Sequence, residues 1–341
     1  MAKVSQRVQL PLPHLSLLIL CVVAAGTAGL FVAGGAYMRR YKRIRRPNRS
    51  QMGVRSGKRT ESFSLSRGRR RIRRGGSLRY NSSMRKALSR RNKWWMSHPH
   101  PIVSVIIPVM NERRTIAKVI HEASRVHPET EVIVVSNGSS DGSDLLAEGA
   151  GAHVIRHANP LGHDVGRAKG AEAAKGEILL FIDGDMIIPA ERLKPFIKAV
   201  AAGVDVALND YSGPTNRRYV HRVVLAKHTL NALLSRSDLK GASMTAVPHA
   251  LSRRAVDAMG TDCLSIPPLA HAKAVHQGLR MERTVSIDVG RLNPIRTKQD
   301  EQDPLTALID NDHLQSVRWI IDQTDNRGGY TDLNRQRHLV R

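Results

Sequence analysis

Two carboxylates one residue apart, Asp183 and Asp185, are the residues of this sequence best suited to do chemistry. They follow a run of bulky, mostly β-prone residues, 178–182, that is short enough to predict a buried strand rather than a buried helix. Two like charges at the end of an apolar strand repel each other and are poorly solvated. A divalent cation removes both problems, and carboxylate oxygens suit Mn²⁺ or Mg²⁺. Taken alone, the pattern is more typical of a solvated turn at the end of a strand, so the rest of the chain must decide.

The basic charge of the chain is concentrated in one segment. The 341 residues carry a formal net charge of +25, but residues 39–97 contain 22 of the 54 Lys and Arg and only one of the 29 acids, Glu61. Residues 98–341 are therefore nearly neutral, which argues against a folded domain built to bind nucleic acid. The two cysteines, Cys21 and Cys263, provide neither a disulfide framework nor a metal-binding cluster, which suits a reducing compartment.

A short tail, residues 1–14, precedes a segment that predicts a transmembrane helix. Residues 15–38 contain no charged residue and are long enough, as a helix, to cross a hydrocarbon core of ~30 Å. The basic residues that follow place the rest of the chain in the cytoplasm by the positive-inside rule. A cleaved secretory signal is the disfavoured alternative, because no clean small-residue cleavage site precedes a polar start. We expect a single-pass protein of the cytoplasmic membrane.

The basic segment, residues 39–97, predicts a disordered linker. It is rich in Arg, Ser, Gly and Asn and poor in large apolar residues, so it cannot bury enough surface to offset the cost of ordering. Beside a membrane helix, we favour attraction to anionic lipid headgroups, worth about 1 kcal/mol per basic residue near the surface. Binding of nucleic acid through phosphates is the disfavoured alternative.

From residue 98 onward, apolar strands alternate with short helices. This alternation predicts an α/β fold with a mostly parallel sheet covered by helices on both faces. We expect strands over residues 103–108, 132–135, 154–155, 178–182 and 204–208, an edge strand over 285–289, and helical structure over 211–240 and 303–322. Polar clusters follow the first, second and fourth of these strands. Ligands of such sheets bind beyond the carboxyl ends of the strands, so we expect the clusters to meet there.

Four segments resemble, in order, the motifs of a known family. VSVIIPVMNE (103–112), VVSNGSSDGS (134–143), GHDVGRAKGAEAAKGE (162–177) and FIDGDM (181–186) are similar to motifs of family 2-type nucleotide-sugar glycosyltransferases with the GT-A fold. The resemblance implies a bacterial, membrane-anchored glycosyltransferase. It also implies a nucleotide-sugar-binding half over residues 98–210, an acceptor-side half over 211–300, and a C-terminal helix and tail over 301–341.

The resemblance assigns the nucleoside of the donor to two loops. Residues from Pro108 through Asn111 to Glu112 would hold the nucleoside, with Glu112 on the ribose, and Asn137 and Asp141 would lie around the base. Ser and Asn stand where the family usually has two Asp residues. Because these side chains accept less strongly from the N3–H of uracil, UDP is the default donor nucleotide but is not fixed.

The resemblance assigns the diphosphate and the metal to a further group of residues. Arg167 and Lys169 would approach the diphosphate or the sugar, Asp183 would contact the ribose or the metal, and Asp185 would bind an Mn²⁺ or Mg²⁺ that bridges the phosphates. His249 would be a third metal ligand or a phosphate contact, although a lone histidine is more often structural. A cation with Lys and Arg would stabilise the charge that develops on the leaving nucleoside diphosphate.

The catalytic base that the family leads one to expect is missing. Inverting members usually carry Glu-Asp where this sequence has Ile266-Pro267. A base must lie within hydrogen-bonding reach of the acceptor hydroxyl. Three alternatives remain: the acceptor is a lipid phosphate that needs no strong base, another residue serves, with Asp262 and His271 nearest in sequence, or the enzyme retains anomeric configuration.

The sequence therefore leaves three classes of function, of which one leads. The leading hypothesis is a metal-dependent glycosyltransferase that uses a nucleotide sugar and a lipid-linked or cell-envelope glycan acceptor. The alternatives are a nucleotide-sugar-binding membrane scaffold without catalysis and a membrane protein that binds nucleic acid through residues 39–97. No GxGxxG follows a predicted strand and no GxxxxGK[ST] occurs, which disfavours a dehydrogenase and a P-loop enzyme.

Overall fold

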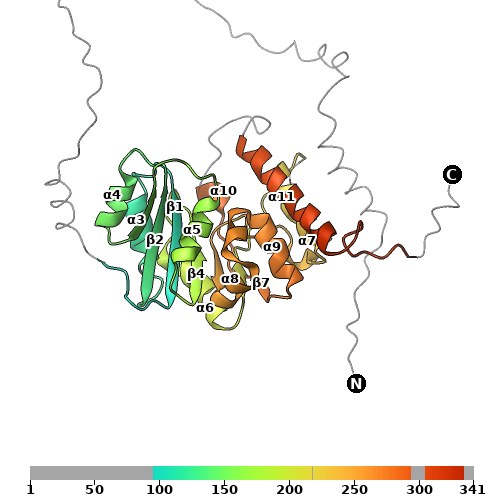
Figure 1. Cartoon of the computed structure of the whole chain (residues 1–341), viewed down its shortest axis with the longest axis horizontal. Coiled ribbons are helices and arrows are strands. Elements are labelled where there is room, and N and C mark those ends of the chain that lie inside the picture. Colours follow the sequence, from blue (N-terminus) through green and yellow to red (C-terminus); the bar gives the residue numbers. More distant parts are fainter. Residues whose placement is uncertain (1–94, 217, 293–303, 334–341) are drawn as a thin grey trace, which may run out of the picture. The chain divides into compact units, whose positions relative to one another are not determined.

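The computed structural model describes residues 95–216, 218–292 and 304–333, which contain a seven-stranded sheet with the order β3-β2-β1-β4-β6-β5-β7 (Figure 1). The strands are β1 (Val103–Val109), β2 (Thr130–Asn137), β3 (His153–His157), β4 (Ile178–Phe181), β5 (Val206–Leu208), β6 (His249–Ser252) and β7 (Met281–Arg283). β1 to β4 are parallel to one another, β6 is antiparallel to both β4 and β5, and β5 is parallel to β7. The prediction of a mostly parallel sheet is confirmed.

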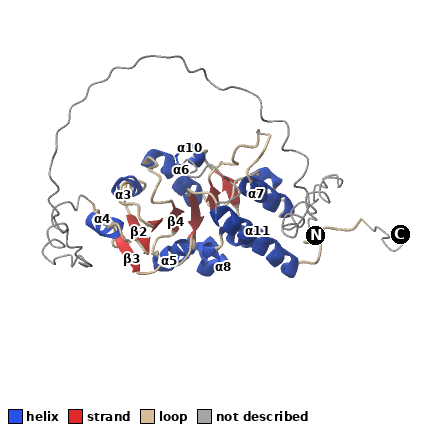
Figure 2. Ribbon diagram, turned by 90° about the horizontal axis from the view of Figure 1, so that it is seen from above, coloured by secondary structure: helices blue, strands red, loops and turns tan. Residues whose placement is uncertain are grey.

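Helices cover both faces of this sheet, as predicted. They are α3 (Ile116–Ala123), α4 (Ser143–Gly149), α5 (Val165–Ala173), α6 (Ala190–Ala201), α7 (Arg222–Leu233), α8 (Arg253–Met259), α9 (Pro267–His276), α10 (Val289–Leu292) and α11 (Pro304–Gln323), with 3-10 turns η1 (Ser237–Leu239) and η2 (Thr261–Ser265). Seen along the sheet, α3 and α6 lie on one face and α5 and α8 on the other (Figure 2). α11 packs against α7 and α9.

Burial explains why the central strands read as continuous apolar runs. Every residue of β2 and β4 is buried, as are six of the seven residues of β1. A parallel strand with helices on both faces has no solvated side, so it does not alternate between apolar and polar residues. β3 lies at the edge of the sheet, and its sequence, HVIRH, is correspondingly polar and partly exposed.

One prediction about the second half of the sheet is wrong, and one strand was not predicted. Residues 285–288 are not a strand, and residues 249–252 form β6, which we did not expect. The side chain of the buried Asn209 explains the wrong prediction. Its Oδ1 accepts from the amide of Ile287 at 2.8 Å, and its Nδ2 donates to the carbonyl of Ile287 at 3.0 Å and to that of Val247 at 3.1 Å. The side chain of Asn209 thus makes the hydrogen bonds to the backbone of Ile287 that a neighbouring strand would otherwise make.

Other predictions are confirmed in part or fall outside the described ranges. The predicted helical region over 211–240 is helical only from Arg222, and the predicted C-terminal helix is α11. No helix in the described ranges is long and apolar enough to cross a membrane. The predicted membrane segment, residues 15–38, lies outside those ranges, as does nearly all of the basic segment.

Helix α5 approaches the sheet closely because it is built of small residues. A Cβ placed on Gly170 would come within 2.3 Å of Cγ2 of Ile106, a fully buried residue in the middle of β1. Interiors are packed too tightly for Ile106 to move aside, because β2 and β4 flank its strand. The glycine is therefore needed to keep α5 against β1.

We expect Gly170→Ala to lower the free energy of unfolding by about 1–3 kcal/mol, since an extra methyl overpacks the core. Gly149→Ala is the matched control, because a Cβ at this helical glycine of α4 meets nothing within 4 Å. It should be neutral or stabilising by up to about 1 kcal/mol. Urea denaturation of both variants measures the difference, and equal effects would contradict this account of α5.

Candidate functional site

Three loops meet beyond the carboxyl ends of β1, β2 and β4, as the sequence predicts for the polar clusters. The hydroxyl of Thr115, just before α3, donates to the carbonyl of Gly184 at 2.7 Å. The amide of Arg113 donates to a carboxylate oxygen of Asp141 at 3.0 Å, and its guanidinium donates to the Asp141 carbonyl at 2.8 Å. These bonds join segments 28 and 69 residues apart in the chain, so the loops form one surface.

Asn111 and Asp141 hold the first two loops together. Asn111 has a positive φ of 61°, and its Oδ1 accepts from the amide of Ser140 at 2.8 Å. Asp141 accepts from the amide and hydroxyl of Ser143 at 2.9 and 2.6 Å. Burial pushes the pKa of Asp141 upward, but the hydrogen bonds from Ser143 and Arg113 outweigh it and lower the pKa. The carboxylate is therefore ionised and occupied by the loop itself.

The side chain of Asn137 is likewise occupied by the protein. Its Oδ1 accepts from the amide of Leu161 at 2.6 Å, and its Nδ2 donates to the carbonyl of Gly162 at 2.7 Å. Asn137 thereby fixes the loop that leads into α5. The structure places Asn137 and Asp141 at the predicted edge, but in roles that shape the loops.

A buried arginine joins the start of α5 to the end of β4. One guanidinium nitrogen of Arg167 lies 3.1 Å from Oδ1 of Asp164, and another lies 3.5 Å from Oδ1 of Asp183. Burial lowers the pKa of Arg167, but the two carboxylates outweigh it and raise the pKa, so the side chain is charged. Sequence analysis missed Asp164, whose only signal is its position three residues before the arginine.

The carboxylate of Asp183 is under opposing influences. Burial raises its pKa most, Arg167 lowers it, and the nearby carboxylates of Asp185 and Asp164 raise it further. The net direction is upward. A group in this position gains from a second positive charge beside it.

These residues fit a divalent cation that completes its shell with other ligands. Asp183 and Asp185 supply two carboxylates at the edge of the sheet, and Mg²⁺ is often held by one or two carboxylates with substrate phosphates and waters. The described residues contain no group of three His, Cys, Asp or Glu placed to hold a metal on their own. Asp183 and Asp185 would therefore hold the ion only together with a bound diphosphate.

His249, expected as a third metal ligand or a phosphate contact, lies in β6 and is buried. Its ring stacks on Phe181 with centroids 5.0 Å apart, and its Nδ1 lies 3.1 Å from the carbonyl oxygen of Ala246. Burial lowers the pKa of His249 to about 3, and the charge of Arg167 acts in the same direction. The ring is therefore neutral and serves to pack the strand.

Lys169 is not brought together with Arg167. The two residues are about 200° apart around α5 because a helix turns about 100° per residue. Lys169 is exposed and lies 2.9 Å from Glu172. The expectation that it approaches the diphosphate has no support in this arrangement.

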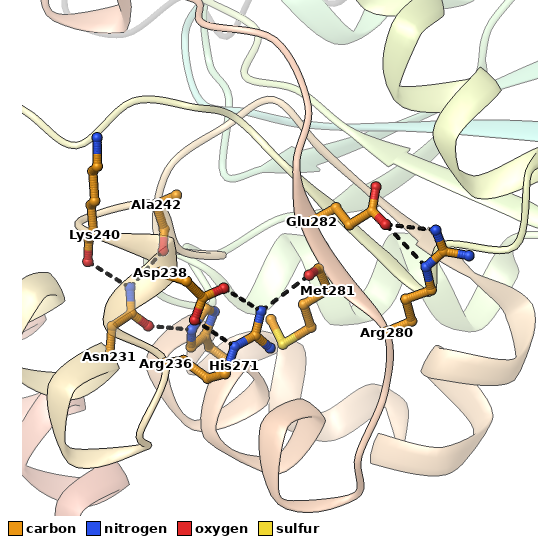
Figure 3. A network of polar contacts seen from close by, with 9 residues as sticks. All are labelled: Asn231, Arg236, Asp238, Lys240, Ala242, His271, Arg280, Met281 and Glu282. Carbon is orange, nitrogen blue, oxygen red and sulfur yellow. Dashed lines mark hydrogen bonds and ion pairs between the residues drawn. The ribbon is translucent and has the colours of Figure 1, made fainter. Parts of the chain in front are cut away.

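Neither sequence candidate for the catalytic base contacts this edge of the sheet. His271 is fully buried in α9, and its Nε2 lies 2.7 Å from Oδ1 of Asn231 (Figure 3). The amide nitrogen of Asn231 in turn donates to the carbonyls of Lys240 and Ala242. Asp262 is exposed in η2. The structure therefore assigns His271 to a structural network and gives Asp262 no contact with Arg167 or Asp183.

A carboxylate that sequence analysis missed comes from α11. Asp312 is only 6% exposed, and burial raises its pKa to about 6. The charge of Asp164 raises that pKa further, whereas His163 lowers it, so Asp312 lies close to the loop that carries Asp164. The sequence gives no signal for this proximity, because about 150 residues separate the two elements and only tertiary packing joins them.

Comparisons with known proteins agree with this geometry. Residues 104–258 match the model of the family described as Glycosyl transferase family 2. The chain is 29% identical over 180 residues to an undecaprenyl-phosphate 4-deoxy-4-formamido-L-arabinose transferase of Pseudomonas fluorescens (strain SBW25), covering 47% of this chain and 50% of that protein. It is 29% identical over 126 residues to a glucosyl-3-phosphoglycerate synthase of Mycolicibacterium paratuberculosis (strain ATCC BAA-968 / K-10), covering 33% and 38%.

The structural comparison supports the fold alone. The crystal structure of glucosyl-3-phosphoglycerate synthase from Mycobacterium tuberculosis in complex with phosphoglyceric acid has a TM-score of 0.50 and 20% identity, covering 63% of this chain and 80% of that chain. The chain spans half or less of the length of the two curated relatives described above.

We expect Arg167→Met to lower the free energy of unfolding by about 3–5 kcal/mol, because it leaves the buried Asp164 without its counter-charge. Lys169→Met, on the same helix, should change it by no more than about 1 kcal/mol, since exposed ion pairs contribute little. Urea denaturation checks both values. A small loss for Arg167→Met would mean that Asp164 does not depend on this arginine.

We expect His271→Gln to make stability less sensitive to acid. Burial lowers the pKa of His271 to about 3 from an ordinary value of 6.5. Between these values the unfolded chain binds a proton that the folded chain excludes, so stability falls as pH drops below 6.5. In the variant, the dependence of the free energy of unfolding on pH should be shallower by up to about 1.4 kcal/mol per pH unit. Denaturation from pH 4 to 7 measures the slope, and an unchanged slope would contradict the assignment.

Proposed function

Since residues 104–258 match the model of glycosyl transferase family 2, we propose that this protein is a metal-dependent glycosyltransferase. It transfers a sugar from a nucleoside diphosphate sugar, by default a UDP-sugar, to a lipid-linked or cell-envelope glycan acceptor. The observation that carries the proposal is the ion-pair chain Asp164–Arg167–Asp183, in which Asp164 and Arg167 are buried and Asp183 is partly exposed, at the carboxyl ends of parallel strands and next to Asp185. Ligands of open α/β sheets bind at such an edge.

Arg167 stabilises the leaving group in the proposed reaction. The bond between the anomeric carbon and the diphosphate oxygen breaks, its electrons stay on the nucleoside diphosphate, and an acceptor oxygen forms the new bond. Arg167 is fixed by Asp164 and Asp183 before any substrate arrives, so it stabilises the developing charge without reorganising. Asp183 and Asp185 would hold Mn²⁺ or Mg²⁺, which when bound supplies further positive charge to the diphosphate.

The acceptor in this proposal carries a phosphate group. The names of the two curated relatives described above each include a phosphate compound. It is undecaprenyl phosphate for the Pseudomonas fluorescens protein and 3-phosphoglycerate for the Mycolicibacterium paratuberculosis protein. A phosphate oxygen is already anionic, so its attack needs no strong base. This chemistry is consistent with Ile266-Pro267 standing where inverting members usually carry an acidic pair.

The proposed location is the cytoplasmic membrane. The uncharged segment 15–38 is a single membrane span in this proposal, with the catalytic domain in the cytoplasm, and residues 39–97 contact anionic lipid. Binding of nucleic acid is the disfavoured use of that segment. If it were the function, deleting residues 39–97 would abolish function while Asp185→Ala would leave it intact.

A scaffold that binds a nucleotide sugar without catalysis is the second candidate, and the missing acidic pair is the observation that favours it. The two candidates differ in one assay. Purified protein with Mn²⁺ should transfer or slowly hydrolyse at least one sugar from a broad panel of nucleotide sugars. A protein that binds one of them but cleaves none is the scaffold.

We expect nucleoside diphosphates to stabilise the wild-type protein only when Mn²⁺ is present, by about 2.7 kcal/mol at one hundred times the dissociation constant. Asp185→Asn should lose this metal-dependent part. Asp257→Asn, an exposed carboxylate of α8, is the matched control and should retain it. Thermal shift with Mn²⁺ or with chelator measures the effect. Binding that does not depend on metal would refute the role given to Asp183 and Asp185.

A further inference from the structure

A lysine on α7 is buried without a counter-charge. Lys227 is 4% exposed, and its Nζ donates only to the carbonyl of Tyr211, at 3.4 Å, and lies 5.4 Å from the centre of that ring. No carboxylate among the residues that the structure describes lies within 4.0 Å of it. An ammonium has three donors, and an isolated buried charge is costly. One long hydrogen bond and a ring face offset little of that cost.

A second buried nitrogen lies close to this lysine. His313 of α11 is 5% exposed, its Nδ1 lies 2.7 Å from the carbonyl oxygen of Ile309, and its Nε2 has no hydrogen-bond partner. Burial lowers the pKa of His313 most, and the charge of the nearby Lys227 lowers it further. α7 and α11 pack against each other, so two helices bring nitrogen atoms with unused hydrogen-bonding capacity to one interior region.

This region adjoins the donor edge of the sheet. Tyr211 follows the carboxyl end of β5, and β5 runs in the same direction as β4 because both are antiparallel to β6. On α11, Asp312 precedes His313 and interacts with Asp164 and His163. Lys227 and His313 therefore lie beside the place where a sugar would be transferred, on the acceptor side.

We propose that Lys227 and His313 form an anion site in the acceptor subsite and bind the phosphate group of the acceptor. The inference rests on the proposed function and deepens it, since it assigns residues to the second substrate. A dianion with free oxygens accepts from the ammonium of Lys227, which no described side chain does. Nδ1 of His313 donates to the carbonyl of Ile309, so Nε2 of the neutral ring is an acceptor. It becomes a second donor to the dianion when the bound negative charge favours protonation of the imidazole. Charge-assisted hydrogen bonds of this kind are the strong ones.

The protonation state of Lys227 gives the proposal a distinctive dependence on pH. Burial lowers the pKa of Lys227 to about 8. The groups facing it are Tyr211 after β5, His228 on α7 and His313 on α11, and His313 in turn adjoins His271 of α9 and the Asp310–Arg222 ion pair. No carboxylate among them contacts Lys227, so its ammonium loses its proton, and the site its charge, as pH rises through about 8.

The test uses sulfate, which stays divalent over the working range of pH, as a probe on the full chain without metal. We expect Lys227→Met to weaken sulfate binding by about tenfold or more and His313→Leu to weaken it by a smaller factor. Lys198→Met removes an exposed lysine of α6 and should leave it unchanged. Wild-type affinity should fall as pH rises through about 8, whereas Lys227→Arg should keep its affinity, because arginine does not lose its proton.

Melting temperature separates a binding role from a structural one. Replacing an uncompensated buried charge with an apolar side chain is often neutral or stabilising. Lys227→Met should therefore melt at the same temperature as wild type or higher while losing sulfate affinity. Equal sulfate affinity in the two proteins overturns the proposal, and so does a loss of affinity that merely accompanies unfolding.

Two competitors identify the source of the phosphate. Glycerol phosphate represents a soluble acceptor, and phosphatidylcholine vesicles with and without polyprenyl phosphate represent a lipid. We expect one of them to compete with sulfate on wild type but not on Lys227→Met, and competition by neither overturns the acceptor assignment. Nucleoside diphosphate with Mn²⁺ should still stabilise Lys227→Met. If wild type binds sulfate at Lys227 but binds no nucleotide, the proposed function fails while the anion site stands.

Discussion

The buried guanidinium of Arg167 is the constraint on which the rest of the site depends. It lies between Asp164, at the start of α5, and Asp183, at the end of β4. Taking Arg167 and Asp164 out of water is costly, and the attraction among the charges offsets that cost only when the geometry is good. That geometry requires α5 to lie close to the sheet, which the small side chain of Gly170 allows. The close packing of α5 against the sheet thus determines where the charge of Arg167 lies at the carboxyl ends of the strands.

The same three charges explain why the edge suits a cation and a diphosphate together. Arg167 offsets one carboxylate, while Asp164, Asp183 and Asp185 leave the edge with an excess of negative charge. Burial raises the pKa of Asp183 most, and the carboxylates of Asp185 and Asp164 raise it further. A divalent cation reverses the sign, and the edge then attracts a diphosphate. The excess of negative charge therefore favours binding of the metal and the nucleotide together. The described residues contain no group of three ligands that could hold a metal on its own, which agrees with this conclusion.

The sequence predicts the donor half of the fold well because its information is local there. β1, β2 and β4 are continuous apolar runs that end in turn-forming residues, and parallel strands bring those ends together. The errors lie where segments distant in the sequence determine the local structure. The pairing of β6 depends on β4 and β5, and the path of residues 285–288 depends on the amide of Asn209. The structure also places Lys169 on another face of α5 than Arg167. Motif spacing does not record which face of a helix a residue occupies.

The proposed acceptor side cannot be predicted from the sequence, because it depends on how α11 packs against the rest of the domain. That helix places Asp312 beside the loop of Asp164 and His313 beside Lys227. The carboxylate of Asp312 and the buried nitrogens of Lys227 and His313 suit different acceptors. A hydroxyl needs a group such as Asp312 to receive its proton, whereas a phosphate needs positive charge and no base. Ile266-Pro267 lacks the family's acidic pair, and the buried ammonium of Lys227 lacks an anion, so both observations favour the phosphate.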